Sequence, residues 1–571
     1  MLALAIVAFA VGAIAGAGHG SSPSVALAGK FVRAWSRGDY ATMYGEISPE
    51  AQRGITPSAF GEDYREDLRT ATVEHRRIAG RARALGGGRV AVPVRLRTRL
   101  WGTLSLTYTI ETVSVSGEER IAWTRSTAFP GVARGLTLTR RTTLPRRATL
   151  LARDGTVLAE SPSEGSGSRS TPLGELASAV VGEVGPIPDS RRHRLEAEGV
   201  PADAEVGTSG LELALDDRLR GTPGGELLAG PQVLASSAPH PAKAVRSTIS
   251  PSVQQAAVTA LGGQLGGVVA IKPSTGQILA VAGIGLNGLQ PPGSTFKIIT
   301  LSGVLGAHLA TPKTVFPYAT YATLDGVRLN NANGEDCGGS LELSFAVSCN
   351  SVFTPLGVKL GARRLVATAE AFGFNHDPGV PGAARSSLPA ASEIQGELDV
   401  GSTAIGQGEV LATPLQMVTV AAAVADGGRR PALSFMADAP PQSSSRAISP
   451  SVARTVRHLM TEVVREGTGT SAAIPNVVVA GKTGTAELKS ACTSSTDEEE
   501  PHESEESETS SKEGCQGGES ESSNTDAWFT AFAPAIHPRI AVCVMLVKDG
   551  AGGDTAAPVA RQVLEAGLHG K

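Results

Sequence analysis

The sequence predicts a multidomain protein that combines α+β and α/β architecture. Its 571 residues exceed what one hydrophobic core usually organises, so several domains are expected. Near the N-terminus a helical pattern precedes alternating strands, which is typical of an α+β unit. From residue 250 on, strand patterns at both ends enclose helical patterns, which indicates one sheet assembled from the two ends of an α/β domain.

The overall charge excludes one class of partner. The net charge of −4 depends on a single acidic run between Asp497 and Glu521, which carries about ten negative charges. Without that run the chain is mildly basic, and it has no basic patch of the kind that binds nucleic acid. No nucleic-acid partner is therefore expected.

The first 18 residues form an uncharged apolar stretch. This is short for a membrane span, which needs roughly 20 residues, and it resembles the hydrophobic region of a signal sequence that lacks its basic start. Ala13 and Ala15 could mark a cleavage site, but an uncleaved anchor is equally open, and a buried N-terminal helix is the alternative. We predict that residues 1–20 are a signal peptide or signal anchor and that the chain is exported.

Residues 24–130 are expected to form a small α+β domain. Leu27, Phe31 and Trp35 recur at four-residue spacing and predict a helix that ends near Gly38. Two alternating apolar runs on either side of Gly102 then predict a hairpin with one face on a core. These runs are Val90, Val92, Val94 and Leu96 before the glycine, and Leu104, Leu106, Tyr108 and Ile110 after it.

Residues 131–247 are expected to form an extended linker or pedestal. Short strand-like runs alternate there with Gly, Pro and Ser, and residues 161–168 have the composition of a flexible loop. An apolar-periodic stretch from Gly210 to Leu219 predicts a short helix.

Residues 248–571 are expected to form the α/β domain. Ser250 and Pro251 predict the start of a helix through Leu261, and Thr413 caps a helical run to Ala425. Strands are predicted at 267–271, 277–282, 477–480, 528–532 and 540–547, and a last helix at about 555–568.

The five cysteines leave the disulfide pairing open. Cys337 and Cys349 could bridge in an oxidising compartment, and so could Cys492 and Cys515. Cys543 lies in an apolar strand pattern and is expected to be a small core residue. No CxxC pair or clustered His and Cys spacing predicts a metal site.

The first of three motifs supplies a nucleophile. Ser294 and Lys297 lie three positions apart at a predicted helix start, so the amine can reach the hydroxyl. A serine needs a base, and a lysine serves as one when burial or a second cation lowers its pKa. Lys482 is the candidate second cation. Taken alone, the pair is more often an ordinary exposed helix turn.

The second motif adds a proton relay and an amide. Ser348 would carry a proton to the departing amine, and Asn350 would bind substrate backbone. A Ser-x-Asn triplet is weak by itself, because Ser522 to Asn524 matches it as well.

The third motif is Lys482, Thr483 and Gly484 on a predicted strand. The lysine and threonine would hold a carboxylate, and the glycine lets a substrate backbone come close. The backbone N–H groups of Ser294 and Thr485 are the expected oxyanion hole. For this tripeptide alone, a solvated lysine at a strand end is the simpler interpretation. The prediction of a catalytic site therefore depends on the order of all three motifs.

Together these motifs resemble those of the penicillin-binding proteins and serine β-lactamases. From Ser250 on, the chain is similar to the penicillin-binding transpeptidase domain, which implies a β-lactamase-like fold with a central antiparallel sheet flanked by helices. The similarity to this domain also includes residues 403–408, 413–417 and 485–487. Upstream of the domain, two segments resemble pedestal motifs of class B members, namely residues 147–159 and 210–212. Residues 24–130 resemble the nuclear-transport-factor-like extension of the low-affinity methicillin-resistance type.

The resemblance implies a peptidoglycan D,D-transpeptidase of the cell membrane with an extracytoplasmic catalytic domain. Ser294 would attack the bond between the terminal D-alanines of a stem peptide, and an amine of a neighbouring stem would resolve the acyl-enzyme. A β-lactam would acylate the same serine. No metal or organic cofactor is expected. The implied partners are stem peptides, β-lactams, the membrane through the N-terminal segment, and proteins of cell-wall synthesis.

Three alternatives use the same motifs. A D,D-carboxypeptidase would replace the acceptor amine with water. A serine β-lactamase would need a second base for its water, and no convincing glutamate pattern lies between the second and third motifs. A non-catalytic penicillin-binding sensor would usually have lost a catalytic residue, whereas this sequence keeps them all.

An acidic insertion at 489–525 interrupts the strand pair that follows the third motif. Its Glu- and Ser-rich composition predicts a disordered, solvated loop. Binding of calcium or of a basic partner is the less favoured interpretation, since such charge blocks are usually solvated.

Overall fold

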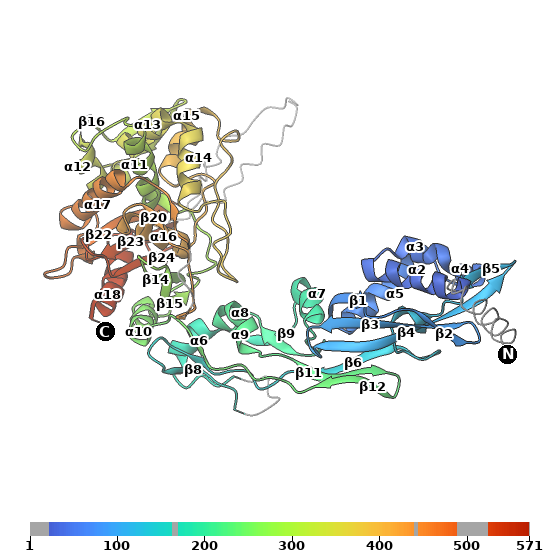
Figure 1. Ribbon diagram of the computed structural model, residues 1–571. Coiled ribbons are helices and arrows are strands. Elements are labelled where there is room, and N and C mark those ends of the chain that lie inside the picture. Colours follow the sequence, from blue (N-terminus) through green and yellow to red (C-terminus); the bar gives the residue numbers. More distant parts are fainter. Residues whose placement is uncertain (1–21, 163–168, 439–442, 488–523, 570–571) are drawn as a thin grey trace, which may run out of the picture.

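The computed structural model describes residues 22–162, 169–438, 443–487 and 524–569. An N-terminal unit and a larger C-terminal unit lie at opposite ends of an extended middle part (Figure 1). The predicted signal segment at 1–20 lies outside the described residues, and so does the acidic insertion apart from its last two positions. Among the described helices, none is long and apolar enough to cross a membrane.

The N-terminal unit consists of helices followed by antiparallel strands. Its elements are α2 (Pro23–Arg37), α3 (Tyr40–Glu46), α4 (Pro49–Gly54), α5 (Pro57–Thr70), β1 (Val73–Ile78), β2 (Arg83–Gly86), β3 (Arg89–Thr98), β4 (Thr103–Val115), β5 (Glu118–Ile121) and the 3₁₀ turn η1 (Arg125–Ala128).

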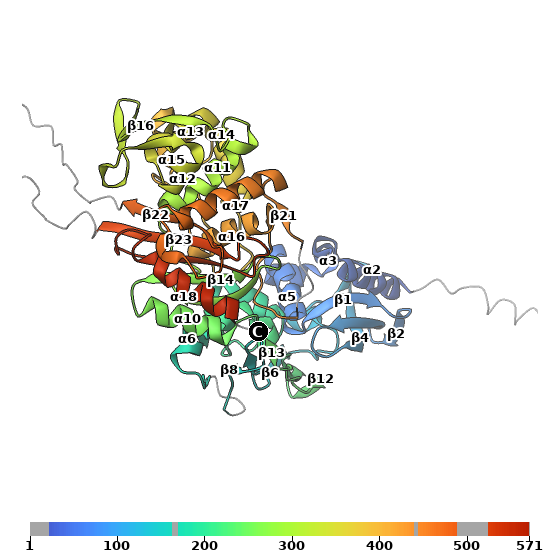
Figure 2. The same cartoon turned by 90° about the vertical axis from the view of Figure 1, so that its left-hand side faces the viewer.

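The predicted helix and hairpin of this unit are confirmed. Helix α2 ends at Gly38, whose left-handed conformation suits a glycine. Strands β3 and β4 pair antiparallel with Val92 opposite Tyr108. The sheet runs in the order β1-β3-β4-β5, with β2 paired to β3. Helix α2 packs on this sheet (Figures 1 and 2). Phe31 and Trp35 of this helix are fully buried in the shared core.

The middle part contains short strands, which form three small sheets, and short helices. They are β6 (Leu138–Thr143), β7 (Leu150–Leu151), β8 (Val157–Ala159), α6 (Glu175–Val181), β9 (Val184–Pro186), α7 (Asp189–Ala197), β10 (Glu205–Gly207), α8 (Gly210–Ala214), α9 (Asp216–Leu219), β11 (Gly224–Ala229), β12 (Gln232–Ser237) and β13 (Val245–Arg246).

Buried ion pairs hold this part together. Glu212 is fully buried and pairs with Arg147 at 2.6 Å and with Arg169 at 2.7 Å. Asp216 pairs with Arg147 at 2.8 Å and with Arg191 at 2.6 Å. Buried carboxylates persist in proteins when they are paired in this way. The two segments that resemble class B pedestal motifs, 147–159 and 210–212, are therefore joined by buried ion pairs.

The prediction of a single short helix from Gly210 to Leu219 is wrong in one detail. The helix is broken at Leu215, whose φ of −115° and ψ of 13° separate α8 from α9. Asp216 begins the second helix, and its carboxylate accepts a hydrogen bond from the backbone N–H of Gly207 at 2.9 Å. The spacing of apolar residues carries no information about such a polar contact, so the sequence pattern does not predict the break.

The C-terminal unit combines one sheet with many helices. Its strands are β14 (Gly266–Lys272), β15 (Gln277–Gly283), β16 (Val315–Ala319), β17 (Tyr321–Leu324), β18 (Val327–Asn330), β19 (Cys337–Ser340), β20 (Arg429–Arg430), β21 (Ser445–Arg446), β22 (Ala480–Glu487), β23 (Thr525–Ala533) and β24 (Ile540–Leu546). Its α-helices are α10 (Pro251–Leu261), α11 (Lys297–Gly306), α12 (Leu341–Ala346), α13 (Asn350–Leu360), α14 (Ala362–Ala371), α15 (Gly396–Ala404), α16 (Pro414–Ala425), α17 (Pro450–Arg465) and α18 (Ala556–His569), and its 3₁₀ turns are η2 (Gly293–Phe296), η3 (Ala332–Gly334) and η4 (Thr470–Ala472).

The predicted antiparallel sheet flanked by helices is confirmed. Five strands run in the order β15-β14-β24-β23-β22, so strands from both ends of the unit form one sheet. Helices α10 and α18 pack on one face and α16 on the other (Figure 2). Successive residues of β14 lie on opposite faces of the sheet. Val268 packs in the core that contains α10 and α18, and Val269 packs in the core that contains α16. Both faces of β14, an inner strand of the sheet, are therefore buried.

Two local expectations in this unit need correction. The apolar run at 477–480 is not a strand throughout, because β22 begins only at Ala480. The chain turns at Asn476, which has a φ of 62°, and Val478 is 62% exposed. Ser250 precedes α10 as predicted, but its hydroxyl contacts Ser252 Oγ at 3.2 Å and makes no capping bond to the helix.

Candidate active site

Ser294 lies in the 3₁₀ turn η2, which runs directly into α11. The turn packs closely against β22 because glycines occur on both sides of the contact. A Cβ atom at Gly293, where φ is +51°, would lie 2.8 Å from Thr485 O. A Cβ at Gly484 would lie 2.7 Å from Pro292 O. Any larger residue would push Ser294 away from the strand.

Lys297 is fully buried one helical turn after Ser294. Its Nζ donates to Ser348 O at 2.6 Å and to Asn350 Oδ1 at 2.7 Å, and it lies 3.3 Å from Ser348 Oγ. Within the described ranges no hydrogen bond joins Lys297 Nζ to Ser294 Oγ, although their spacing predicted that the amine can reach the hydroxyl. Hydrogen bonds of catalytic groups often tighten only when substrate is bound.

Ser348 and Asn350 lie where α12 ends and α13 begins. Ser348 has a φ of +63°, a left-handed conformation that is uncommon for a residue with a side chain. Cys349 between them forms a disulfide with Cys337, one of the two predicted pairings, whereas Cys492 and Cys515 lie outside the described residues. The backbone that presents this motif is thus cross-linked to β19.

Lys482, Thr483, Gly484 and Thr485 all lie on β22, as predicted for a strand motif. Lys482 is fully buried, and its Nζ donates to Ser348 Oγ at 2.8 Å. Thr483 Oγ1 lies 2.6 Å from the hydroxyl of Thr468, which precedes the strand. The structure therefore brings residues of all three motifs into one place.

Burial governs the protonation of both lysines. The pKa of Lys297 lies well below its usual range, first because burial removes solvent from the ammonium and second because Lys482 is close. Burial lowers the pKa of Lys482 to about 7. The predicted influence of Lys482 on Lys297 is present, but desolvation is the larger cause.

Thr468 is a polar neighbour of the site that the sequence did not single out. It lies between Gly467 and Gly469 in the segment that links α17 to β22. The two glycines were the only local signal of a close backbone approach, and nothing in the spacing connected this threonine with Thr483.

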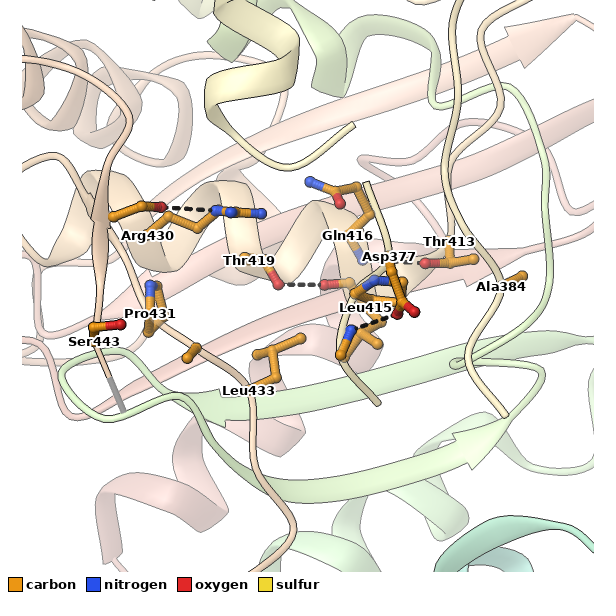
Figure 3. A pocket seen from close by; sticks show the side chains of 14 residues that line it. Asp377, Ala384, Thr413, Leu415, Gln416, Thr419, Arg430, Pro431, Leu433 and Ser443 are labelled. Carbon is orange, nitrogen blue, oxygen red and sulfur yellow. Dashed lines mark hydrogen bonds between the residues drawn. The ribbon is translucent and has the colours of Figure 1, made fainter. Parts of the chain in front are cut away.

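A cavity of about 220 Å³ lies beside α16, and Figure 3 shows the side chains that line it. Arg430, Gln416 and Asp377 are among its lining residues, and none of the predicted site residues lines it. Among its described lining residues no nucleophile is hydrogen-bonded to a base, so the cavity is not the site that the three motifs predict.

One group of side chains in the described residues has metal-ligand types. Ligand atoms of Glu342, His458 and Glu462 lie within 4.8 Å of one another. His458 Nε2 is 2.9 Å from Glu342 Oε1, and Arg465 pairs with Glu462. Ion pairs within and around the group account for this arrangement.

Two family models match the chain. Residues 266–565 match the penicillin binding protein transpeptidase domain, and residues 163–229 match the penicillin-binding protein dimerisation domain. The first match contains every predicted site residue.

Named relatives agree with these matches. The chain is 32% identical over 397 residues to peptidoglycan D,D-transpeptidase PbpA of Mycolicibacterium smegmatis, which covers 57% of this chain and 72% of that protein. Among solved structures it is similar to the D,D-transpeptidase domain of a peptidoglycan glycosyltransferase from Eggerthella lenta, with 30% identity, a TM-score of 0.57, and coverage of 74% of this chain and 98% of the other. It is also similar to the imipenem acyl-enzyme of penicillin-binding protein A from M. tuberculosis, with 26% identity, a TM-score of 0.56, and coverage of 74% and 99%.

Proposed function

This chain belongs to the penicillin-binding protein transpeptidase family, and from that membership we propose that it is a class B peptidoglycan D,D-transpeptidase that uses Ser294 as its nucleophile. The hydroxyl attacks the carbonyl between the two terminal D-alanines of a stem peptide. The C–N bond breaks, D-alanine leaves with a proton on its amine, and an acyl-enzyme remains. An amine of a second stem peptide then forms the cross-link and releases the serine. β-Lactams acylate the same oxygen.

The hydrogen bonds of Lys297 are the observation that carries the proposal. A neutral amine has two N–H groups and one lone pair. The two N–H groups are directed to Ser348 O and Asn350 Oδ1, so the lone pair is left to accept the proton of Ser294. The lowered pKa of Lys297 favours this neutral form.

Ser348 lies between the two lysines and is placed to pass on the proton that Lys297 takes up. Its hydroxyl lies 3.3 Å from Lys297 Nζ and 2.8 Å from Lys482 Nζ. In this proposal Lys297 takes the proton from Ser294, and Ser348 delivers it to the departing amine. Asn350 orients the lysine and binds substrate backbone.

The strand β22 supplies the remaining groups. Lys482 and Thr483 attract the terminal carboxylate of the stem peptide, and Gly484 leaves room for it. The backbone N–H groups of Ser294 and Thr485 form the oxyanion hole. The close approach of Gly293 to Thr485, where a Cβ would lie 2.8 Å from the threonine carbonyl oxygen, supports this pairing of turn and strand.

A labelled penicillin tests the proposal. Incubation of the exported portion with the label, digestion and mass spectrometry should locate one adduct at Ser294. The Ser294→Ala variant should carry none, and Ser302→Ala, which changes a buried serine of α11 about two helical turns after Ser294, is the matched control that keeps the label. An adduct that persists in Ser294→Ala would refute the assignment, and rapid loss of the label would indicate a β-lactamase.

We also propose that residues 24–130 are a nuclear-transport-factor-like extension, and that residues 1–20 attach the protein to the cell membrane with the catalytic domain outside. Four helices that precede an antiparallel sheet support the first proposal. Fractionation of cells that express the full chain or a chain without residues 1–20 tests the second. Equal distribution of both chains between membrane and soluble fractions would contradict it.

A further inference from the structure

The hydroxyl of Thr468 contacts the third motif from outside it. Thr468 Oγ1 lies 2.6 Å from Thr483 Oγ1, and either oxygen can be the donor. Thr468 Oγ1 also lies 3.4 Å from Ala346 O, while its backbone N–H donates to the same carbonyl at 3.1 Å. Thr468 thus contacts both β22 and the last residue of α12.

The backbone of Thr468 is held independently of its hydroxyl. A Cβ at Gly467 would lie 2.2 Å from Ala346 O, and a Cβ at Gly469 would lie 3.0 Å from the ring of Phe529. The segment therefore passes too close to its neighbours for larger residues. The N–H bond to Ala346 O and this packing remain when the Thr468 side chain is changed.

We propose that Thr468 is a positioning residue that orients the hydroxyl proton of Thr483 toward the substrate carboxylate. This inference rests on the proposed function, in which Thr483 holds that carboxylate. A carboxylate only accepts hydrogen bonds, so Thr483 must donate to it. The 2.6 Å contact then has one allowed direction: Thr468 donates its single hydroxyl proton to Thr483, and its longer 3.4 Å approach to Ala346 O receives no hydrogen bond from this hydroxyl. A hydroxyl that accepts one bond donates the next one more strongly.

The same geometry links the carboxylate to the second motif. Ala346 ends α12, and Ser348 follows two residues later. Thr468 therefore joins the strand that binds the carboxylate to the segment that presents the proton relay. Removing its hydroxyl breaks the first link and leaves the backbone link to Ala346 in place.

Acylation of Ser294 by two ligands tests this inference. The ligands are benzylpenicillin, which has a carboxylate, and its methyl ester, which has none. In Thr468→Val the second-order rate constant with benzylpenicillin should fall roughly 3- to 10-fold, the effect expected for one hydrogen bond, while the rate with the ester stays near the wild-type value. Thr468→Ser should restore the wild-type rate. Thr470→Val, an exposed threonine two positions on, is the matched control and should change neither rate.

Two results would overturn the inference. Equal losses with the acid and the ester would mean that Thr468 only maintains the fold of the cleft. A rate in Thr468→Val that matches wild type with both ligands would mean that Thr483 needs no partner. If the wild type itself is not labelled at Ser294 by benzylpenicillin, the proposed function fails and this inference fails with it.

Discussion

Lys482 Nζ lies 2.8 Å from Ser348 Oγ, and Lys297 Nζ lies 3.3 Å from the same oxygen. Two lysines from different elements thus share one serine hydroxyl in a buried place. Because a hydroxyl both donates and accepts, Ser348 can carry a proton between them without moving far. The protonation of the two lysines is therefore coupled through one side chain.

The pH dependence of acylation should follow Lys482. Its pKa of about 7 means that it loses its charge above neutral pH, so its attraction for a carboxylate declines there. The second-order rate constant for benzylpenicillin should therefore fall above about pH 7. Raising the pH favours the neutral form of Lys297, which is the form that acts as the base, so this lysine does not cause the fall. In Lys482→Arg the guanidinium stays charged, so the alkaline fall should disappear even if the rate is lower throughout. Stopped-flow fluorescence measures this rate constant across the pH range. A wild-type rate constant that still rises at pH 9 would contradict the assignment.

Asn350→Ala should slow acylation roughly 10- to 100-fold, a part of what a positioned base contributes. The change removes the acceptor that lies 2.7 Å from Lys297 Nζ, so the lone pair of the lysine is no longer fixed. Asn330→Ala is the matched control, because Asn330 is exposed and contacts Asn350 only through its backbone oxygen. Similar rate constants for the two variants would show that Asn350 does not orient the lysine.

Loss of the Cys337–Cys349 disulfide should lower the free energy of unfolding by about 2–3 kcal/mol, as expected for a short closed loop. The double variant Cys337→Ala/Cys349→Ala should also unfold at a lower temperature than wild type in calorimetry. Dithiothreitol should lower the wild-type midpoint and leave that of the double variant unchanged. An unchanged midpoint in the double variant would mean that packing alone holds the loop.

Glu212→Gln should destabilise the protein by roughly 3 kcal/mol, because Arg169 loses the carboxylate with which it pairs and Arg147 keeps only its pair with Asp216. Glu175→Gln, an exposed position in the first turn of α6, is the control and should have little effect. Labelling of Ser294 at 25 °C should be the same in both variants, since the ion pairs lie in the middle part of the chain. Equal stability of the two variants in urea would contradict the importance of the buried cluster.

Deletion of residues 490–524 should leave the acylation rate nearly unchanged. Strands β22 and β23 pair on either side of the insertion, so a short turn can join them. The rate of Ser294 labelling is the measurement, and a large loss would show that the acidic segment contributes to the active site.

Local patterns predicted most of the fold. Alternation of apolar residues placed the hairpin of β3 and β4, and turn chemistry placed β14 and β15. The sequence also singled out the two buried lysines, Lys297 and Lys482, because their motifs are short and have a fixed order. What the patterns missed depends on contacts between segments separated in the sequence: the break at Leu215 accompanies a carboxylate bound to Gly207, and the proposed role of Thr468 depends on its contact with Thr483. Neither contact leaves a periodic trace in the sequence.

The position of β24 has a consequence for synthesis of the protein. This strand lies between β14 and β23 at the centre of the sheet, yet it follows β14 in the chain only after all the helices of the unit except α10 and α18. The emerging polypeptide therefore cannot complete this sheet until Leu546 has left the ribosome. A premature stop before Ile540 would leave β14 and β23 without their shared neighbour and expose two apolar strand edges to aggregation.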